Sequence, residues 1–538
     1  MSNIVRGTML LTGASFLSKF LGMIYVIPFQ WLVGETGGTL YAYAYTPYSI
    51  LISISTIGVP LAVSKFVSKY NSLGDYETGM RMFKAGIALM AVTGFLGFLV
   101  LFFGAELMAS FIISNENIGV IATADVTMVI RAVSFALLII PAMSIVRGFF
   151  QGYESMAPTA VSQVVEQIAR IIFLLSATFI VMTLFESIPI AVGFATFAAV
   201  IGALASCVVL FVFWRKRKPA IQKQIQQQRV THDIPKKELV KELFSYAGPF
   251  VLVGIAIPLY QLVDQFTFKR AMIAIGEGNI SDIVYSAINL YGHKLVIIPV
   301  TIATGLSLAV LPALTKSFTK DNKQLLNQQI NQSFQIILVL VVPAVVGLSM
   351  LSDVAYGSLY GMKHISMTGS LLGWYAPVAL LFALFTVTAA ILQGVNQQRF
   401  AAVSLSGGLL VKVLFNIQLI HIFGAKGAIF GTALAAGTAV ILNIWRIKSS
   451  TQFSFKQTFK RFLLICIFSI IMCIIIWILR TLFGTFLAYE ESRLSATIML
   501  ISGVVAGGGV YLWFAYESTL LERLLGNRVR VLDKIFRR

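Results

Sequence analysis

The sequence predicts an all-α polytopic membrane protein with fourteen transmembrane helices. Of its 538 residues, 58% are hydrophobic and only 12% are charged, a composition that an ordinary soluble chain does not have. The apolar residues lie in stretches of about 20, the length that a helix needs to cross a hydrocarbon core of roughly 30 Å. The first stretch shows no small-residue cleavage pattern, so we interpret it as a retained helix rather than a secretory signal.

The predicted helices follow one another along the whole chain. Their centres lie near residues 20, 54, 95, 137, 171, 201, 255, 300, 341, 383, 410, 436, 471 and 505. With the N-terminus placed in the cytoplasm, most of the 41 lysines and arginines fall on the cytoplasmic side, which is the distribution of the positive-inside rule. We therefore expect both termini in the cytoplasm.

Two basic clusters carry much of the net charge of +19: "WRKRKPAIQKQIQQQR" (214–229) and "ERLLGNRVRVLDKIFRR" (522–538). Each follows a predicted helix on the cytoplasmic side. We therefore interpret them as topology signals that also contact anionic membrane lipids, and we expect no nucleic-acid partner.

Two sequence matches indicate an internal repeat. The segment "AVSKFVSKYN" (62–71) aligns with "ALTKSFTKDN" (313–322), and "FFQGYESMAPTAVSQVVEQIARIIF" (149–173) aligns with "ILQGVNQQRFAAVSLSGGLLVKVLF" (391–415). Helices 1 to 6 and 7 to 12 are thus predicted to be homologous lobes in parallel orientation, as in transporters that rock two halves around a midplane site. The predicted division is a first lobe over 1–214, a basic cytoplasmic linker over 215–240, a second lobe over 241–450, and two extra helices with a basic tail over 451–538.

Two lysines lie deep in predicted helices. If the first helix starts near Thr8, Lys19 lies about 16 Å into the membrane, and Lys294 lies at a similar depth in the eighth helix. Burying such charges costs a few kcal/mol each, so an intramembrane lysine is by default a functional hypothesis. Pairing with a carboxylate or with backbone carbonyls is the structural alternative.

A third lysine, Lys412, aligns with Arg170 in the repeat. Glu166 precedes Arg170 by four residues, the favourable helical order for an ion pair, so we predict a structural pair between them. Gly408 replaces the glutamate in the second lobe, which leaves the role of Lys412 open.

The strings "SKFLG" (18–22), "KLVIIP" (294–299) and "LAVLPALTKSF" (308–318), together with the two-lobe layout, resemble the MurJ-type lipid II flippases of the MOP superfamily. The strings "GDYETG", "VRGFFQG" and "PTAVSQVVEQIARIIFLLSAT" (158–178) are similar to the YtgP-like branch of Gram-positive bacteria. This resemblance implies a protein of the bacterial cytoplasmic membrane, not an enzyme. It implies that the chain moves the undecaprenyl-pyrophosphate-linked peptidoglycan precursor to the outer leaflet by alternating access.

The resemblance also implies site residues. Lys19 and Lys294 match family arginines that receive the pyrophosphate in a central cavity, and Lys412 is a third candidate for that role. Some members bind sodium in the second lobe, and the plausible counterparts here are Asp264, Asn416 and Thr432. Asp264 has an alternative partner in Lys269 or Arg270. We expect no organic cofactor, no firmly assigned metal and a monomer, and coupling to Na⁺ or to the membrane potential stays open.

Three other classes of protein share some of these sequence features. A flippase for another polyprenyl-linked glycan, such as a teichoic acid, capsule or spore-cortex precursor, is not separable by sequence. A MATE-like drug/cation antiporter shares the two lobes, but usually stops at twelve helices and uses membrane carboxylates. A membrane enzyme would need a catalytic constellation, whereas the four histidines are scattered: His232, His293, His364 and His421.

Overall fold

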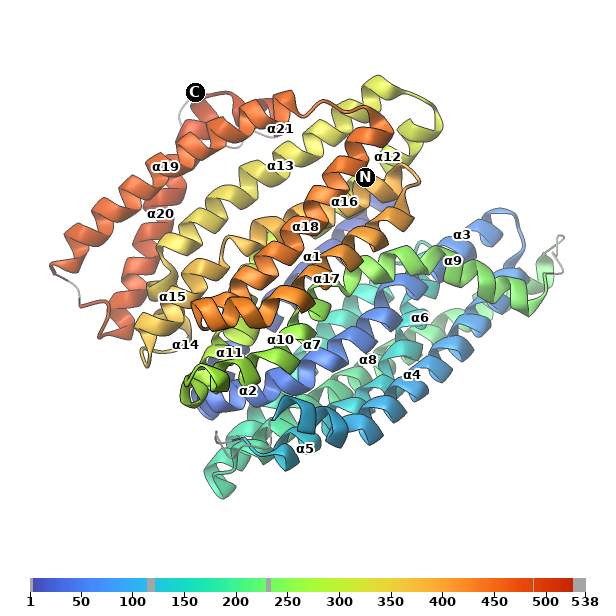
Figure 1. The fold of residues 1–538 in the computed structure, drawn as a ribbon. Helices are drawn as coiled ribbons and strands as arrows, with labels where there is room; N and C mark the ends of the chain where they lie inside the picture. The colour runs from blue at the N-terminus through green and yellow to red at the C-terminus, as the bar shows by residue number, and fades with distance from the viewer. Residues whose placement is uncertain (1–2, 114–120, 229–233, 487, 526–538) are drawn as a thin grey trace. The chain divides into compact units, whose positions relative to one another are not determined.

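The computed structural model describes residues 3–113, 121–228, 234–486 and 488–525, and all regular secondary structure in these ranges is helical (Figure 1). The chain divides into two compact units, with the boundary between Ile273 and Ala274. Part of the predicted linker, 229–233, and most of the predicted basic tail, 526–538, lie outside the described residues.

The first unit is built from long helices whose starts are marked by proline and by an aspartate cap. A proline lies in the first turn of α6, α7 and α8, where its missing N–H costs nothing. The Asp75 carboxylate accepts from the Thr78 N–H at 2.9 Å and so caps α4. The elements are α1 (Asn3–Ile24), α2 (Val26–Ser53), η1 (Ile54–Gly58), α3 (Val59–Ser72), α4 (Tyr76–Ile112), α5 (Thr123–Ser134), η2 (Phe135–Leu138), α6 (Ile140–Gly152), α7 (Ala157–Phe185), α8 (Ile188–Gln227), α9 (Lys236–Gly254) and α10 (Ala256–Ala274).

The helical path of α2 is broken at Gly34. This residue has φ 65° and ψ −165°, a conformation that glycine adopts without steric cost. The apolar run that contains it, residues 13–72, is 60 residues long. As one straight helix it would measure about 90 Å, roughly three times the thickness of a hydrocarbon core. An interruption such as the one at Gly34, about a third of the way along the run, is therefore expected in a membrane.

The second unit begins with short irregular helices and continues with long ones. The Asn322 side chain caps α13 by accepting from the Leu325 N–H at 3.0 Å. The elements are η3 (Gly278–Ile280), α11 (Ser281–Ser286), η4 (Ala287–Gly292), α12 (His293–Thr319), α13 (Lys323–Met350), α14 (Ser352–Tyr360), α15 (Ile365–Tyr375), α16 (Val378–Gly394), α17 (Gln398–Phe423), α18 (Lys426–Thr451), α19 (Lys456–Gly484), α20 (Arg493–Glu517) and α21 (Leu520–Leu525).

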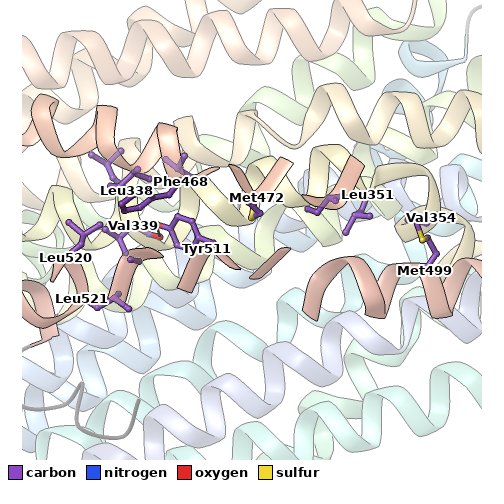
Figure 2. Close-up of a cluster of buried hydrophobic side chains, with 14 of the residues drawn as sticks. Leu338, Val339, Leu351, Val354, Phe468, Met472, Met499, Tyr511, Leu520 and Leu521 are labelled. Atoms are coloured by element: carbon purple, nitrogen blue, oxygen red, sulfur yellow. Dashed lines mark hydrogen bonds between the residues drawn. The ribbon is translucent and has the colours of Figure 1, made fainter. Parts of the chain in front are cut away.

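The last long helices, α19 and α20, share an apolar core with α13 and α14 (Figure 2). The Tyr511 hydroxyl lies within this core and donates to the Val339 carbonyl at 2.8 Å, so the polar end of the ring is satisfied. The labelled side chains in Figure 2 are Leu338, Val339, Leu351, Val354, Phe468, Met472, Met499, Tyr511, Leu520 and Leu521. The two C-terminal helices are thus an integral part of the second unit.

Twelve segments of the described residues are long and apolar enough to cross a membrane. The sequence predicts fourteen, and the two counts differ at two places. Residues 13–72 form one continuous segment where two helices are predicted, and the region around the predicted centre at residue 255 does not qualify.

Large apolar side chains point outward from several long helices. Phe103 on α4, Leu184 on α7 and Val505 on α20 are 71%, 69% and 68% exposed. Water would penalise such a surface, whereas lipid tails match it. The fold is therefore that of an all-helical, multi-pass membrane protein.

Candidate functional site

Lys19 lies on α1, which packs against α7 within the first unit. The Ser15 hydroxyl, one turn earlier on the same helix face, donates to the Gln163 side chain of α7 at 3.1 Å. The Lys19 side chain itself is exposed. The structure therefore anchors the helix one turn before this lysine, whose side chain is exposed as a whole.

Arg170 of α7 lies among tyrosines. Its guanidinium donates to the Tyr41 hydroxyl at 3.1 Å and lies over the Tyr45 ring, with 5.6 Å between the guanidinium carbon and the ring centroid. The Tyr41 hydroxyl is also 3.1 Å from the hydroxyl of Tyr25, which stands at the junction between α1 and α2. The Arg170 Nε is buried and has no hydrogen-bond partner. Arg170 thereby links α7 to α2 directly, and Tyr41 extends the contact to Tyr25 at the start of α2.

The predicted ion pair between Glu166 and Arg170 is not the one that forms. The Glu166 carboxylate pairs instead with Arg147 of α6 at 2.6 Å. Arg147 also donates to the hydroxyls of Ser162 at 2.9 Å and Ser206 at 2.7 Å, so three groups from α7 and α8 satisfy one guanidinium. An i,i+4 pair is worth only about 0.2–0.5 kcal/mol, which is too little to outweigh this network.

Arg147 was therefore missed as a site residue, although it lies in the "VRGFFQG" string. Because Arg147 takes the carboxylate, Arg170 has no carboxylate partner among the described residues. Arg170 is therefore a second cation of the first unit, besides Lys19, that could attract an anion.

Lys294 is the second residue of α12 in the second unit. It follows η4, a π-helical segment over Ala287–Gly292, and such segments occur frequently at functional sites. Its side chain is half-buried. The neighbouring His293 is fixed by a contact of 2.9 Å between its Nδ1 and the Tyr375 hydroxyl of α15. Lys294 thus lies directly after a π-helical segment and next to a histidine that contacts Tyr375.

Lys412 has a different environment from the other two lysines. It is 0% exposed, and its ammonium group donates to the Thr432 hydroxyl and to the Ala428 carbonyl, the latter at 3.3 Å. Asn416, one turn further along α17, is equally buried. The role of Lys412 in substrate binding therefore stays a prediction, because its side chain has no accessible surface in this structure.

The predicted cation ligands do not all lie in one unit. Asn416 and Thr432 belong to the α17–α18 hairpin of the second unit, whereas Asp264 lies on α10 in the first and is 2% exposed. Lys269, an alternative partner of Asp264, is also 2% exposed. The described residues contain no group of three or more His, Cys, Asp or Glu side chains that could hold a metal ion.

Comparison with known proteins gives consistent results. Residues 4–318 match the family described as "Polysaccharide biosynthesis protein". The "Lipid II flippase MurJ" of Bacillus subtilis (strain 168) is 46% identical over 531 residues, which cover 98% of each chain. The match thus extends over both units and the two C-terminal helices.

Solved structures show the same fold. "Lipid II flippase MurJ, inward closed conformation" aligns with a TM-score of 0.66 at 18% identity, covering 96% of this chain and 99% of that one. An inward-facing multidrug resistance MATE family transporter of the MOP superfamily aligns with a TM-score of 0.59 at 15% identity, covering 81% and 99%. The resemblance read from the sequence motifs is thereby confirmed, and the chain belongs to the MurJ-type family of lipid II flippases, transporters of the MOP superfamily.

Proposed function

We propose that this protein moves lipid II from the inner to the outer leaflet of the bacterial cytoplasmic membrane by alternating access. The observation that carries the proposal is the 46% identity to the Bacillus subtilis lipid II flippase over 98% of both chains. The fold by itself would not decide the substrate, because multidrug MATE transporters share it.

Lys19 and Lys294 are the side chains that we expect to receive the pyrophosphate. A pyrophosphate that leaves water for a low-dielectric cavity loses solvation, and fixed ammonium groups offset that cost. Lys19 is exposed and Lys294 is half-buried, whereas Lys412 is fully buried. Arg170, which has no carboxylate partner among the described residues, is a further candidate, whereas the buried Lys412 is a weaker one.

The proposed topology has fourteen crossings, with both termini in the cytoplasm. The break at Gly34 supports two crossings within residues 13–72. We place the two homologous lobes at 1–214 and 241–450, joined by the basic linker at 215–240 and followed by the two extra helices. The outward-facing apolar side chains of those helices suit contact with a polyprenyl tail: Ile470, Ile474, Trp477 and Val505.

Complementation tests the substrate directly. We would express the chain in cells in which the resident lipid II flippase can be depleted, and measure growth together with lipid II that becomes accessible on the outer surface. The proposal predicts that both recover. If the protein reaches normal abundance in the membrane and both still fail, the proposal is wrong. Rescue of teichoic acid, capsule or cortex precursor export instead would identify the other polyprenyl-linked glycans as its substrates.

A further inference from the structure

The α17–α18 hairpin surrounds the Lys412 ammonium group with buried oxygens. Ala428 contributes a backbone carbonyl and Thr432 a hydroxyl, and both oxygens accept from the Lys412 ammonium group. All three residues are at least 95% buried, with exposed fractions of 0%, 5% and 0%. Carbonyl and hydroxyl oxygens inside a membrane protein are the groups that coordinate alkali cations.

The two helices of the hairpin lie close together near the ammonium group. Gly431 of α18 faces Asn416 of α17 so closely that a Cβ on this glycine would lie 2.5 Å from the Asn416 Oδ1. Two positive charges about 4 Å apart also repel each other by roughly 4 kcal/mol at an effective dielectric constant of 20. A sodium ion would have to displace the ammonium group, which the lysine side chain holds in place covalently.

The predicted sodium ligand Thr432 is therefore not available to a sodium ion in this chain, because its hydroxyl oxygen already accepts from the Lys412 ammonium group. We propose that the Lys412 ammonium group is a built-in cation that replaces a bound alkali ion in the α17–α18 hairpin. The second unit then carries this charge permanently, and its folding does not depend on Na⁺. The inference concerns the hairpin alone and goes beyond the proposed function, so it holds or fails independently of the transported substrate.

The test is the thermal stability of the purified full-length protein in detergent, measured in NaCl and in choline chloride at equal ionic strength. The wild type should have the same Tm in both salts. Lys412→Ala removes the ammonium group and leaves the oxygens, so its Tm should fall in choline chloride and rise saturably with added Na⁺. The double variant Lys412→Ala, Thr432→Val should lose that rise, because it also lacks the hydroxyl ligand.

Lys448→Ala is the matched control, because Lys448 lies in the same hairpin, on α18, and is exposed. This variant should have the same Tm in NaCl and in choline chloride. A wild-type Tm that rises saturably with Na⁺ but not with choline would overturn the inference, and so would a Lys412→Ala variant as stable as the wild type in choline chloride. If Lys412→Ala cannot be purified, calorimetric titration of the wild type decides: absence of saturable Na⁺ binding supports the inference, and its presence contradicts it.

Discussion

Two ion pairs in the first unit each join neighbouring helices, but they differ in burial. Arg147 and Glu166 have side chains that are only 13% and 22% exposed, and they join α6 to α7. The exposed pair of Lys69 and Glu242, at 50% and 34%, also joins two helices, but water screens it. The two pairs therefore differ in what the loss of one partner costs.

Glu166→Ala should lower the free energy of unfolding by about 2–3 kcal/mol, because it leaves the Arg147 guanidinium in a largely buried site without its carboxylate. Glu242→Ala, which removes an exposed partner, should cost no more than about 1 kcal/mol. Thermal unfolding in detergent gives the order of the two variants. Equal Tm values for the two variants would show that the Arg147–Glu166 network does not stabilise the first unit.

Which charges lie within apolar helices could be predicted from the sequence, but their partners could not. An apolar context identifies Lys19, Arg170 and Lys412 as intramembrane cations. The i,i+4 rule considers only one helix, so it paired Glu166 with Arg170 and overlooked Arg147 on α6. It also could not show that α18 supplies the oxygens that surround Lys412.

At the scale of helices, close backbone approach sets the geometry of the α17–α18 hairpin. Gly427, in the first turn of α18, lies so near the Leu419 carbonyl of α17 that a Cβ would stand 2.1 Å from its oxygen. Small residues allow such contacts between membrane helices. Gly437, further along α18, has nothing within 4 Å of its Cβ position and serves as a comparison.

Gly427→Ala should destabilise the protein by about 1–3 kcal/mol, because the obstructing atoms are backbone atoms that cannot rotate away. Gly437→Ala should be neutral or stabilising by up to about 1 kcal/mol, since alanine is the better helix former. Both variants can be compared by thermal unfolding in one detergent. A Gly427→Ala variant with wild-type Tm would mean that the helices separate at little cost.

Helix positions were predictable because about 20 apolar residues suffice to mark a crossing. The interruptions were harder to predict. The break at Gly34 depends on one φ angle of 65°, and the π-helical segment before Lys294 carries no composition signal of its own. The predicted seventh crossing, centred near residue 255, is not among the twelve segments found in the described residues.

At the scale of the whole molecule, each unit contains one of the two lysines that we expect to receive the pyrophosphate. Lys19 belongs to the first unit and Lys294 to the second, which is the distribution expected if two halves share one anionic head group. Lysine keeps the charge of the family arginines but not their bidentate geometry. The charge itself is therefore the property to test.

The most direct test is the accumulation of lipid II on the outer surface of cells that depend on this protein, normalised to its abundance in the membrane. Lys19→Met and Lys294→Met keep side-chain length and apolar bulk but remove the charge, so each should abolish translocation, whereas Lys→Arg at either position should retain much of it. Lys223→Met, an exposed lysine in the basic linker, is the matched control and should transport normally. Near-wild-type translocation by the double Lys19→Met, Lys294→Met variant at normal abundance would contradict the account.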